Sequence, residues 1–304
     1  MKKLLFAVSI ALILTACSKN EPQSDYTQFV NPLIGTDYTG NTYPGAQVPF
    51  GMVQLSPDNG LPGWDRIAGY FYPDSTIAGF SHTHLSGTGA GDLYDPLGIH
   101  SKFSHSNESA CAGYYQVRLT DYDINVELTA TQRCGIQRYT FPKGKQPIVL
   151  LNLAKAMNWD FTKDTEITVI DSVTIAGYRF SDGWARDQKL YFCTRFSRPF
   201  TKHEITADSV ALKGEYIGMA KNARFEFAET ENQEIVVSTA LSCTSVENAR
   251  KNLAAEVPTD DFATYLALAK EMWNNELARI EITTSDTDAR TIFYTALYHS
   301  MLAP

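Results

Sequence analysis

The sequence predicts a mainly β protein, in which a large antiparallel β-sandwich precedes a set of helices. From about residue 29 to residue 242, alternating or continuous apolar segments follow one another with no helical period between them. The composition agrees, because 16 Tyr, 16 Phe and 19 Gly among 304 residues favour strands and turns over a helical bundle. Ten or more strands without intervening helices imply two packed layers rather than a doubly wound or TIM-barrel architecture.

The N-terminus has the pattern of a lipoprotein signal peptide over residues 1–17. Two lysines precede an apolar run over residues 4–16, which is too short to span a bilayer. The run ends in Leu14-Thr15-Ala16-Cys17, which resembles a bacterial lipobox, so Cys17 is the predicted lipidation site; ordinary secretory cleavage is the alternative. Residues 18–26 are predicted to be a polar tether. We therefore expect an exported lipoprotein anchored to a membrane, facing the periplasm or the cell surface.

The predicted β-domain extends over residues 27–243. Its clearest strands, Tyr114–Leu119 and Ile124–Thr131, alternate with period two and are joined by a four-residue turn, which predicts a hairpin with one buried face. Continuous apolar or small runs at Ile148–Leu153 and Ile235–Leu241 predict central strands covered on both faces. Further strands are predicted at Ile167–Ile170, Val173–Phe180, Leu190–Phe196 and Arg224–Phe227.

A helical period begins after this domain. Capping-box spacing predicts a helix that ends near Glu256, and a second helix carries an apolar stripe from Phe262 to Leu277; together they form a predicted helical linker over residues 244–284. A third helix has an apolar stripe from Ala289 to Met301. Because nothing follows that stripe to pack against it, we expect residues 285–304 to be the truncated beginning of a larger helical domain.

The charge balance argues against a nucleic-acid partner. The chain has 26 Lys and Arg against 34 Asp and Glu, a formal net charge of −8, and no basic cluster beyond its first residues. The cysteines after Cys17 lie in apolar or aromatic surroundings, so we expect buried thiols rather than disulfides. These cysteines are Cys111, Cys134, Cys193 and Cys243.

The unusual residues gather in a loop-rich stretch between Asn31 and Asp95, where glycine and proline are dense. Its most suggestive pair is Trp64 beside Asp65. An aromatic ring can stack on the C–H face of a sugar while a neighbouring carboxylate accepts hydroxyl hydrogen bonds, which is the combination a carbohydrate site needs. The alternative is a core tryptophan at a turn.

His82 and His84 are two residues apart, so on a strand they would share a face. Three interpretations remain open for the pair: a metal ligand pair, a hydrogen-bonding role toward substrate, and a structural role. Asp92 stands where a dinucleotide fingerprint would have its last glycine, so the glycines before it predict a tight turn. Glycoside hydrolysis needs two carboxylates, and the spacing singles out no pair among the candidates Asp58, Asp65, Asp92 and Asp95.

The same stretch resembles glycoside hydrolase family 92, the calcium-dependent exo-acting α-mannosidases. The most specific part of the resemblance is the string Phe80-Ser81-His82-Thr83-His84-Leu85-Ser86-Gly87-Thr88-Gly89. The resemblance covers nearly all of residues 27–304. Its other parts are Phe29–Thr36, Tyr43–Ala46, Glu127–Thr131, Arg138–Pro142 and Phe293–His299.

This resemblance implies a β-sandwich, linker helices and an (α/α)₆ barrel that begins near Asp286. It implies that the general acid, the general base and most Ca²⁺ ligands lie in the barrel, so we expect neither the acid nor the base in this fragment and expect Ca²⁺ to bind mainly in the missing catalytic domain. The intact protein would be an inverting α-mannosidase acting on terminal α-mannosides of glycans. The predicted substrate-binding residues are Trp64, Asp65, His82, His84 and Asp92. The alternative function is a stand-alone, non-catalytic carbohydrate-binding lipoprotein.

Overall fold

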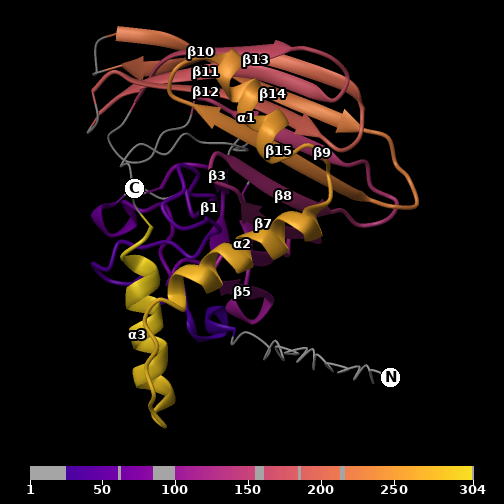
Figure 1. Cartoon of the computed structure of the whole chain (residues 1–304). Coiled ribbons are helices and arrows are strands. Elements are labelled where there is room, and N and C mark those ends of the chain that lie inside the picture. The colour runs from indigo at the N-terminus through magenta and orange to yellow at the C-terminus, as the bar shows by residue number, and fades with distance from the viewer. Residues whose placement is uncertain are drawn as a thin grey trace, which may run out of the picture.

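The computed structural model describes residues 25–60, 63–84, 100–154, 161–183, 186–212 and 216–302. These residues form fifteen β-strands and three α-helices, with the strands first in the chain and the helices last (Figure 1). The mainly β prediction is therefore confirmed. The predicted signal peptide with Cys17, and nearly all of the predicted tether, lie outside the described residues.

One layer of the fold is an eight-stranded antiparallel sheet with the strand order β10-β11-β12-β15-β8-β7-β6-β5. The predicted hairpin is present in it, because β6 and β7 pair with Leu119 opposite Ile124. The strands are β5 (Glu108–Cys111), β6 (Tyr114–Leu119), β7 (Ile124–Ala130), β8 (Cys134–Thr140), β10 (Phe161–Val169), β11 (Thr174–Asp182), β12 (Gln188–Phe196) and β15 (Glu234–Ser242).

The second layer is sheet in one half and loops in the other. A three-stranded sheet in the order β13-β14-β9 covers one half of the large sheet, and two short strand pairs, β1 with β3 and β2 with β4, lie among the loops that cover the rest. The apolar core fills the space between the layers. The strands are β1 (Ser56–Asp58), β2 (Thr76–Ile77), β3 (Gly79–Ser81), β4 (Ser101–Lys102), β9 (Ile148–Asn152), β13 (Phe200–Leu212) and β14 (Tyr216–Phe227).

Of the two strands predicted to be central, one is central and the other is not. β15 lies between β12 and β8, and all of its residues after Glu234 are buried. β9 pairs only with β14 among the described strands, and its burial alternates, with Val149 and Leu151 inside while Ile148 and Leu150 are half-buried. β9 is thus an edge strand despite its continuous apolar run. Its half-buried face, with Ile148 and Leu150, borders a pocket and is not covered by another layer.

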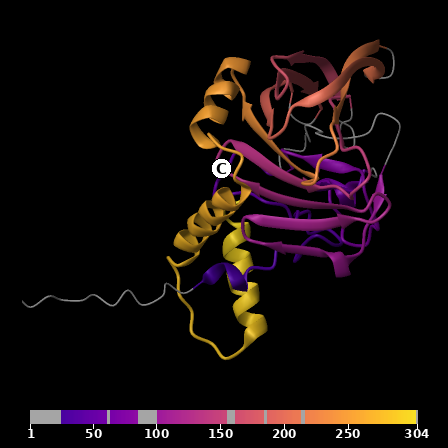
Figure 2. The ribbon, with the colours of Figure 1, turned by 90° about the vertical axis from the view of Figure 1, so that its right-hand side faces the viewer.

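Two helices cover the outer face of the eight-stranded sheet. α1 (Val246–Glu256) and the first half of α2 (Phe262–Leu277) pack on small and apolar residues of β8, β11, β12 and β15. Figures 1 and 2 show both helices on that face. Each begins with a capped turn, in which the Ser245 side chain accepts from the Asn248 amide and the Asp261 side chain accepts from the Ala263 amide.

α3 (Thr287–His299) packs with a face that the sequence did not indicate. Its buried residues are Tyr294, Thr295 and Tyr298, and the two tyrosines join Trp273 of α2 in a separate apolar cluster. Half of the predicted apolar stripe is exposed instead, namely Ala289, Ile292 and Ala296, with Ile292 61% exposed, while Phe293 and Leu297 border the cluster and Met301 is buried in it. The predicted stripe did not include the tyrosines, because their hydroxyl groups make them partly polar. It therefore missed the face that Tyr294 and Tyr298 bury. No helix among the described residues combines the length and the apolar character that a membrane span needs.

The cysteines are free thiols, but the prediction that all are buried is wrong. Cys134 and Cys193 are buried under α1, and burial raises the pKa of the Cys193 thiol to about 11 and that of the Cys134 thiol to about 12. Cys111 is half-buried, and burial raises its pKa as well. Cys243 is exposed. It directly follows β15 and precedes the first turn of α1, so neither element covers it.

Candidate functional site

The Trp64–Asp65 pair lies on a surface loop. The two residues belong to the 3₁₀ turn η2 (Trp64–Arg66), which begins after Gly63. The Trp64 side chain is 60% exposed and Asp65 is exposed beside it. The alternative of a core tryptophan is therefore wrong, because Trp64 lies outside every apolar cluster of the described residues. An exposed indole next to an exposed carboxylate can present a ring face and a hydrogen-bond acceptor to one sugar.

A buried polar cluster lies at the end of β1, close in the sequence to this loop. His84 is fully buried and its Nδ1 is 2.7 Å from the Gln54 carbonyl oxygen, which can only accept, so Nδ1 donates. Its Nε2 lies 3.1 Å from Asp58 Oδ1 and 3.2 Å from Ser81 Oγ. The backbone amide of His84 donates to Gln54 Oε1 over 2.9 Å. His84 is thus fixed through both ring nitrogens and its amide.

This cluster is not a serine-hydrolase triad. In such a triad the carboxylate and the serine contact opposite nitrogens of the histidine, so that the ring transfers a proton between them. Here Asp58 and Ser81 approach the same nitrogen of His84. The arrangement orients the ring and does not activate the serine. Asp58 Oδ2 is buried and has no hydrogen-bond partner among the described residues.

Among the described residues, no third ligand joins His82 and His84 in a group that could hold a metal ion. β3 ends at Ser81, so residues 82–84 do not continue the strand that would align their side chains. The His82 ring is fully buried against β8, where a Cβ on Gly135 would lie 2.5 Å from it. Glycine is therefore the residue that lets this ring pack. Asp92, like Asp95, lies outside the described residues.

The carboxylate of Glu108 accepts hydrogen bonds from two tyrosines and joins the segments that carry them. Glu108 of β5 is completely buried and accepts hydrogen bonds from the Tyr70 hydroxyl, over 2.9 Å, and from the Tyr115 hydroxyl, over 2.6 Å. Its other oxygen lies 2.7 Å from His105 Nδ1, and His105 Nε2 faces the Tyr72 carbonyl at 2.8 Å. Burial first, and then the nearby Glu108 charge, raises the pKa of both tyrosines far above the usual range. The phenols therefore stay protonated and donate to the carboxylate.

The helical segment is joined to the same loops by buried hydrogen bonds. The Trp273 indole donates to the Gln47 carbonyl over 2.6 Å. The Gln47 side chain donates to the Leu302 carbonyl over 3.1 Å and accepts from the Tyr43 hydroxyl. Gln54, which holds His84, donates to the same Leu302 carbonyl over 3.4 Å. The chain that follows α3 is thus tied directly to the residues that orient His84.

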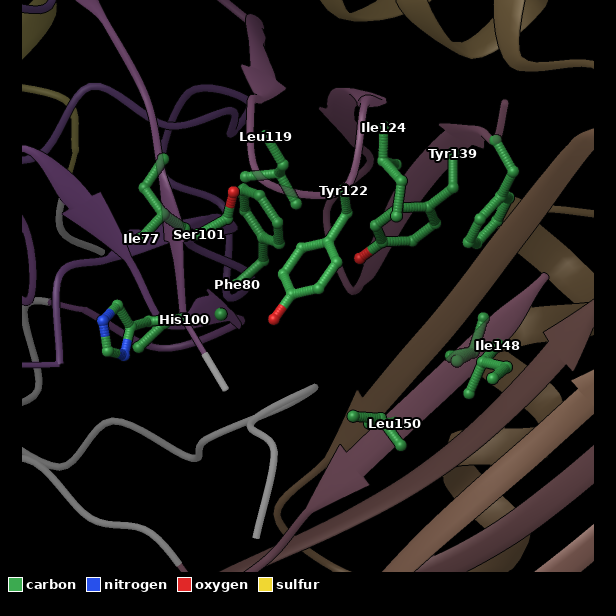
Figure 3. A pocket seen from close by; sticks show the side chains of 14 residues that line it. Ile77, Phe80, His100, Ser101, Leu119, Tyr122, Ile124, Tyr139, Ile148 and Leu150 are labelled. Carbon is green, nitrogen blue, oxygen red and sulfur yellow. The ribbon is translucent and has the colours of Figure 1, made fainter. Parts of the chain in front are cut away.

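A separate pocket of about 130 Å³ opens between the two layers. β3 lies between this pocket and the polar cluster, since Phe80 lines the pocket and the neighbouring Ser81 contacts His84. Figure 3 shows the rings of Phe80, Tyr122 and Tyr139 around the gap, with β9 across from them. Its described lining residues include no Asp or Glu. The described part of the lining therefore supplies none of the carboxylates that glycoside chemistry requires.

Metal ligands do not gather in the described part of the chain. No group of three or more His, Cys, Asp or Glu side chains there could hold a metal ion. Sequence reasoning named Trp64, Asp65 and the histidines, but it missed Gln54 and Ser81 as partners of His84. No spacing signal could have found them, because Gln54 lies 30 residues before His84 and meets it only through the pairing of β1 with β3.

The described residues thus form a two-layer β-domain with an exposed Trp–Asp loop, followed by packed helices. Two family models match the chain: the glycosyl hydrolase family 92 N-terminal domain over residues 29–242, and the glycosyl hydrolase family 92 catalytic domain over residues 248–304. The first of these alone covers most of the chain. The chain belongs to glycosyl hydrolase family 92.

Solved structures and a curated relative agree with this assignment. A family GH92 α-mannosidase from Bacteroides thetaiotaomicron is 30% identical, with a TM-score of 0.82 over 92% of this chain and 41% of that chain. A family GH92 inverting mannosidase from the same organism is 28% identical, with a TM-score of 0.79 over 93% and 40%. An uncharacterized secreted glycosidase from Arthroderma benhamiae is 25% identical over 93% of this chain and 42% of its own length. The chain thus spans about 40% of the length of these relatives.

Proposed function

We propose that this chain is the N-terminal part of an exo-acting, inverting α-mannosidase that removes terminal α-mannose from glycans. Membership of family 92 and the structural likeness to two mannosidases support this proposal. The observation in the structure that carries it is the exposed Trp64 ring beside the exposed Asp65 carboxylate. In the proposed site, Trp64 stacks on the terminal sugar and Asp65 accepts hydrogen bonds from its hydroxyl groups.

The chemistry requires groups that this proposal assigns to the helical domain beginning with residues 285–304. In an inverting glycosidase, a carboxylic acid protonates the leaving oxygen while a carboxylate activates water, about 6.5–9.5 Å away. The β-domain of residues 27–243 contributes substrate contacts rather than either of these groups. The hydrogen bonds from Gln47 and Gln54 to Leu302 support this division. They hold the start of the helical domain against the loop-rich stretch that also contains Trp64.

The histidines take a supporting role in this proposal. His82 and His84 were expected to contact substrate, but both side chains are fully buried. His84 also engages both ring nitrogens with protein atoms. We therefore propose a structural role for both histidines. Asp92, beyond the described residues, stays a predicted substrate contact.

Calcium does not enter this account of the described residues. The family resemblance implies a Ca²⁺ ion, and such an ion takes six to eight oxygen ligands. The described residues do not fit it, since they bring together no group of acidic side chains of that kind. We propose that calcium is held mainly by the helical domain.

Two observations on the full-length gene product test the proposal. Reading the gene beyond codon 304 should show an open frame of helical sequence, and the encoded protein should release mannose from an aryl α-mannoside. A stop codon at that point, with glycan binding but no turnover, would instead support a stand-alone carbohydrate-binding module. A protein that shows neither glycan binding nor turnover would contradict both functions.

We further propose that the protein is exported and anchored through acylated Cys17, as its N-terminal sequence predicts. The secreted relative supports export, and the lipobox-like ending supports anchoring. Metabolic labelling with a fatty-acid probe should tag the wild-type protein but not Cys17→Ser, because two or three acyl chains on this residue would form the anchor. Cys243→Ser, which removes an exposed thiol elsewhere, is the matched control and should label normally. Equal labelling of wild type and Cys17→Ser would exclude the anchor.

A further inference from the structure

Three buried polar side chains meet on the inner face of the eight-stranded sheet. They are Gln137 of β8, Thr194 of β12 and Thr239 of β15, each at most 6% exposed. Their strands are neighbours in the order β12-β15-β8, and the pairing places Thr194 opposite Thr239. Because a buried polar group without a hydrogen-bond partner is costly, each of the three side chains needs such a partner.

The hydrogen bonds between described residues do not complete this group. The Tyr139 hydroxyl donates to Gln137 Oε1, so Nε2 is the other end of that side-chain amide. This Nε2 is buried and has no hydrogen-bond partner in the described part of the chain. The hydroxyl oxygens of Thr194 and Thr239 are 2.8 Å apart, so one hydroxyl donates to the other. The hydroxyl that accepts still has its own hydrogen to donate.

A cavity of about 20 Å³ lies at these three side chains. They are its polar lining, and its apolar lining comes from both layers of the fold. Every lining residue is buried, so the cavity is closed to solvent. A space of about 10–15 Å³ is enough for one water molecule, and each molecule of bulk water occupies about 30 Å³, so the cavity has room for one. The apolar lining residues are Val149, Leu151, Ile175, Phe196, Phe225 and Val237.

The chemistry of the lining selects the occupant. No lining residue is charged, so the cavity offers no compensation for the cost of burying an ion. The Gln137 amide and the accepting threonine hydroxyl both have hydrogens to donate, so the occupant must offer an acceptor oxygen. A water molecule can accept from both groups and can return one of its own hydrogens to a threonine oxygen. This gives it about three hydrogen bonds, as is usual for buried water.

We propose that this cavity binds one structural water molecule, which bridges Gln137 of β8 and the Thr194–Thr239 pair of β12 and β15. The water completes the hydrogen bonds of a polar group that two apolar layers enclose. It also links three neighbouring strands through their side chains, in addition to the backbone ladder. A glutamine inside the sandwich is thereby accommodated without an unpaired donor. The site is independent of the proposed sugar contacts.

The first test is a crystal structure of the full-length protein at a resolution that shows ordered water. We expect one density peak inside the cavity, within about 3.2 Å of Gln137 Nε2 and of a threonine hydroxyl oxygen. Other buried water molecules in the same map serve as the internal control. A map that shows those molecules but no density in the cavity would overturn the proposal.

The second test fills the cavity and measures thermal unfolding. Val237 lines the cavity, so Val237→Ile adds a methylene group to it and displaces the water. Gln137 Nε2 then loses its partner, and we expect the melting temperature to fall by about 2–6 °C. In Gln137→Met, which has no donor to leave unpaired, the same change should lower it by less than half as much.

Val236→Ile is the matched control for this cycle. Val236 is buried on the opposite face of the same strand, so it reports ordinary overpacking and should have equal effects in both backgrounds. A higher melting temperature in Val237→Ile would show that the methylene group fills apolar space that held no water. That result, or equal losses from Val237→Ile with and without Gln137, would overturn the proposal.

Discussion

Trp64→Ala is expected to lower kcat/KM of the full-length enzyme for an α-mannoside by ~30- to 1000-fold while leaving the fold intact. The Trp64 ring is 60% exposed and belongs to no apolar cluster of the described residues, so its removal leaves no cavity. Loss of an aromatic contact that orients the sugar costs about 2–4 kcal/mol of transition-state binding. The effect should therefore appear in kinetics and not in stability.

The measurement pairs Michaelis kinetics with thermal unfolding. We expect the melting temperature of Trp64→Ala to stay within about 2 °C of wild type, as for other exposed substitutions. Tyr38→Ala is a matched control, because it removes another exposed aromatic ring, 80% accessible, from a different loop. Wild-type kcat/KM in Trp64→Ala, or a loss explained by a collapsed melting temperature, would show that Trp64 has no substrate role.

Glu108→Gln is expected to lower the free energy of unfolding by about 3 kcal/mol. The substitution keeps the shape of the side chain, so it creates no cavity and isolates the charge. The buried carboxylate accepts from two tyrosine hydroxyls, and it faces His105 Nδ1. An amide in its place is neutral, so the hydrogen bonds that both tyrosines donate to Oε1 lose the strengthening that the carboxylate charge gives them.

Chemical denaturation of the chain itself measures this loss. Asp123→Asn is the control, since the Arg118–Asp123 pair is exposed on both sides and the change should cost less than about 0.5 kcal/mol. Asn also tolerates the positive φ of 59° at position 123. A loss of under 1 kcal/mol in Glu108→Gln would show that the carboxylate is not a structural centre of these loops.

The pattern of apolar residues predicted several strands of the large sheet. The β6–β7 hairpin and β15 follow directly from alternation and from a continuous apolar run. β8 and β13 were missed, each for a local reason. β8 buries Gln137 and places Gly135 against His82, which breaks the apolar pattern, while β13 carries mostly exposed polar residues in its described part and exists through its pairing with β14.

Part of the candidate site followed from residue chemistry, and part required the fold. The Gly-rich context of Trp64 correctly predicted a surface loop, and the apolar stripe of α2 correctly predicted a packed helix. The burial of His84 depends on Asp58 and Gln54, which meet it through strand pairing that no spacing reveals. The Arg66–Asp74 ion pair was equally hidden, because a pair eight residues apart in a loop has no fixed geometry.

The anomeric configuration of the first sugar released shows whether the full-length protein is an inverting α-mannosidase. The full-length protein is incubated with an aryl α-mannoside and followed by ¹H NMR from the first minutes, before mutarotation mixes the anomers. An inverting mechanism requires that water attack the face opposite the leaving group. The account predicts β-mannose first, followed by slow appearance of the α-anomer. Release of α-mannose first, or no release of mannose at all, would contradict it.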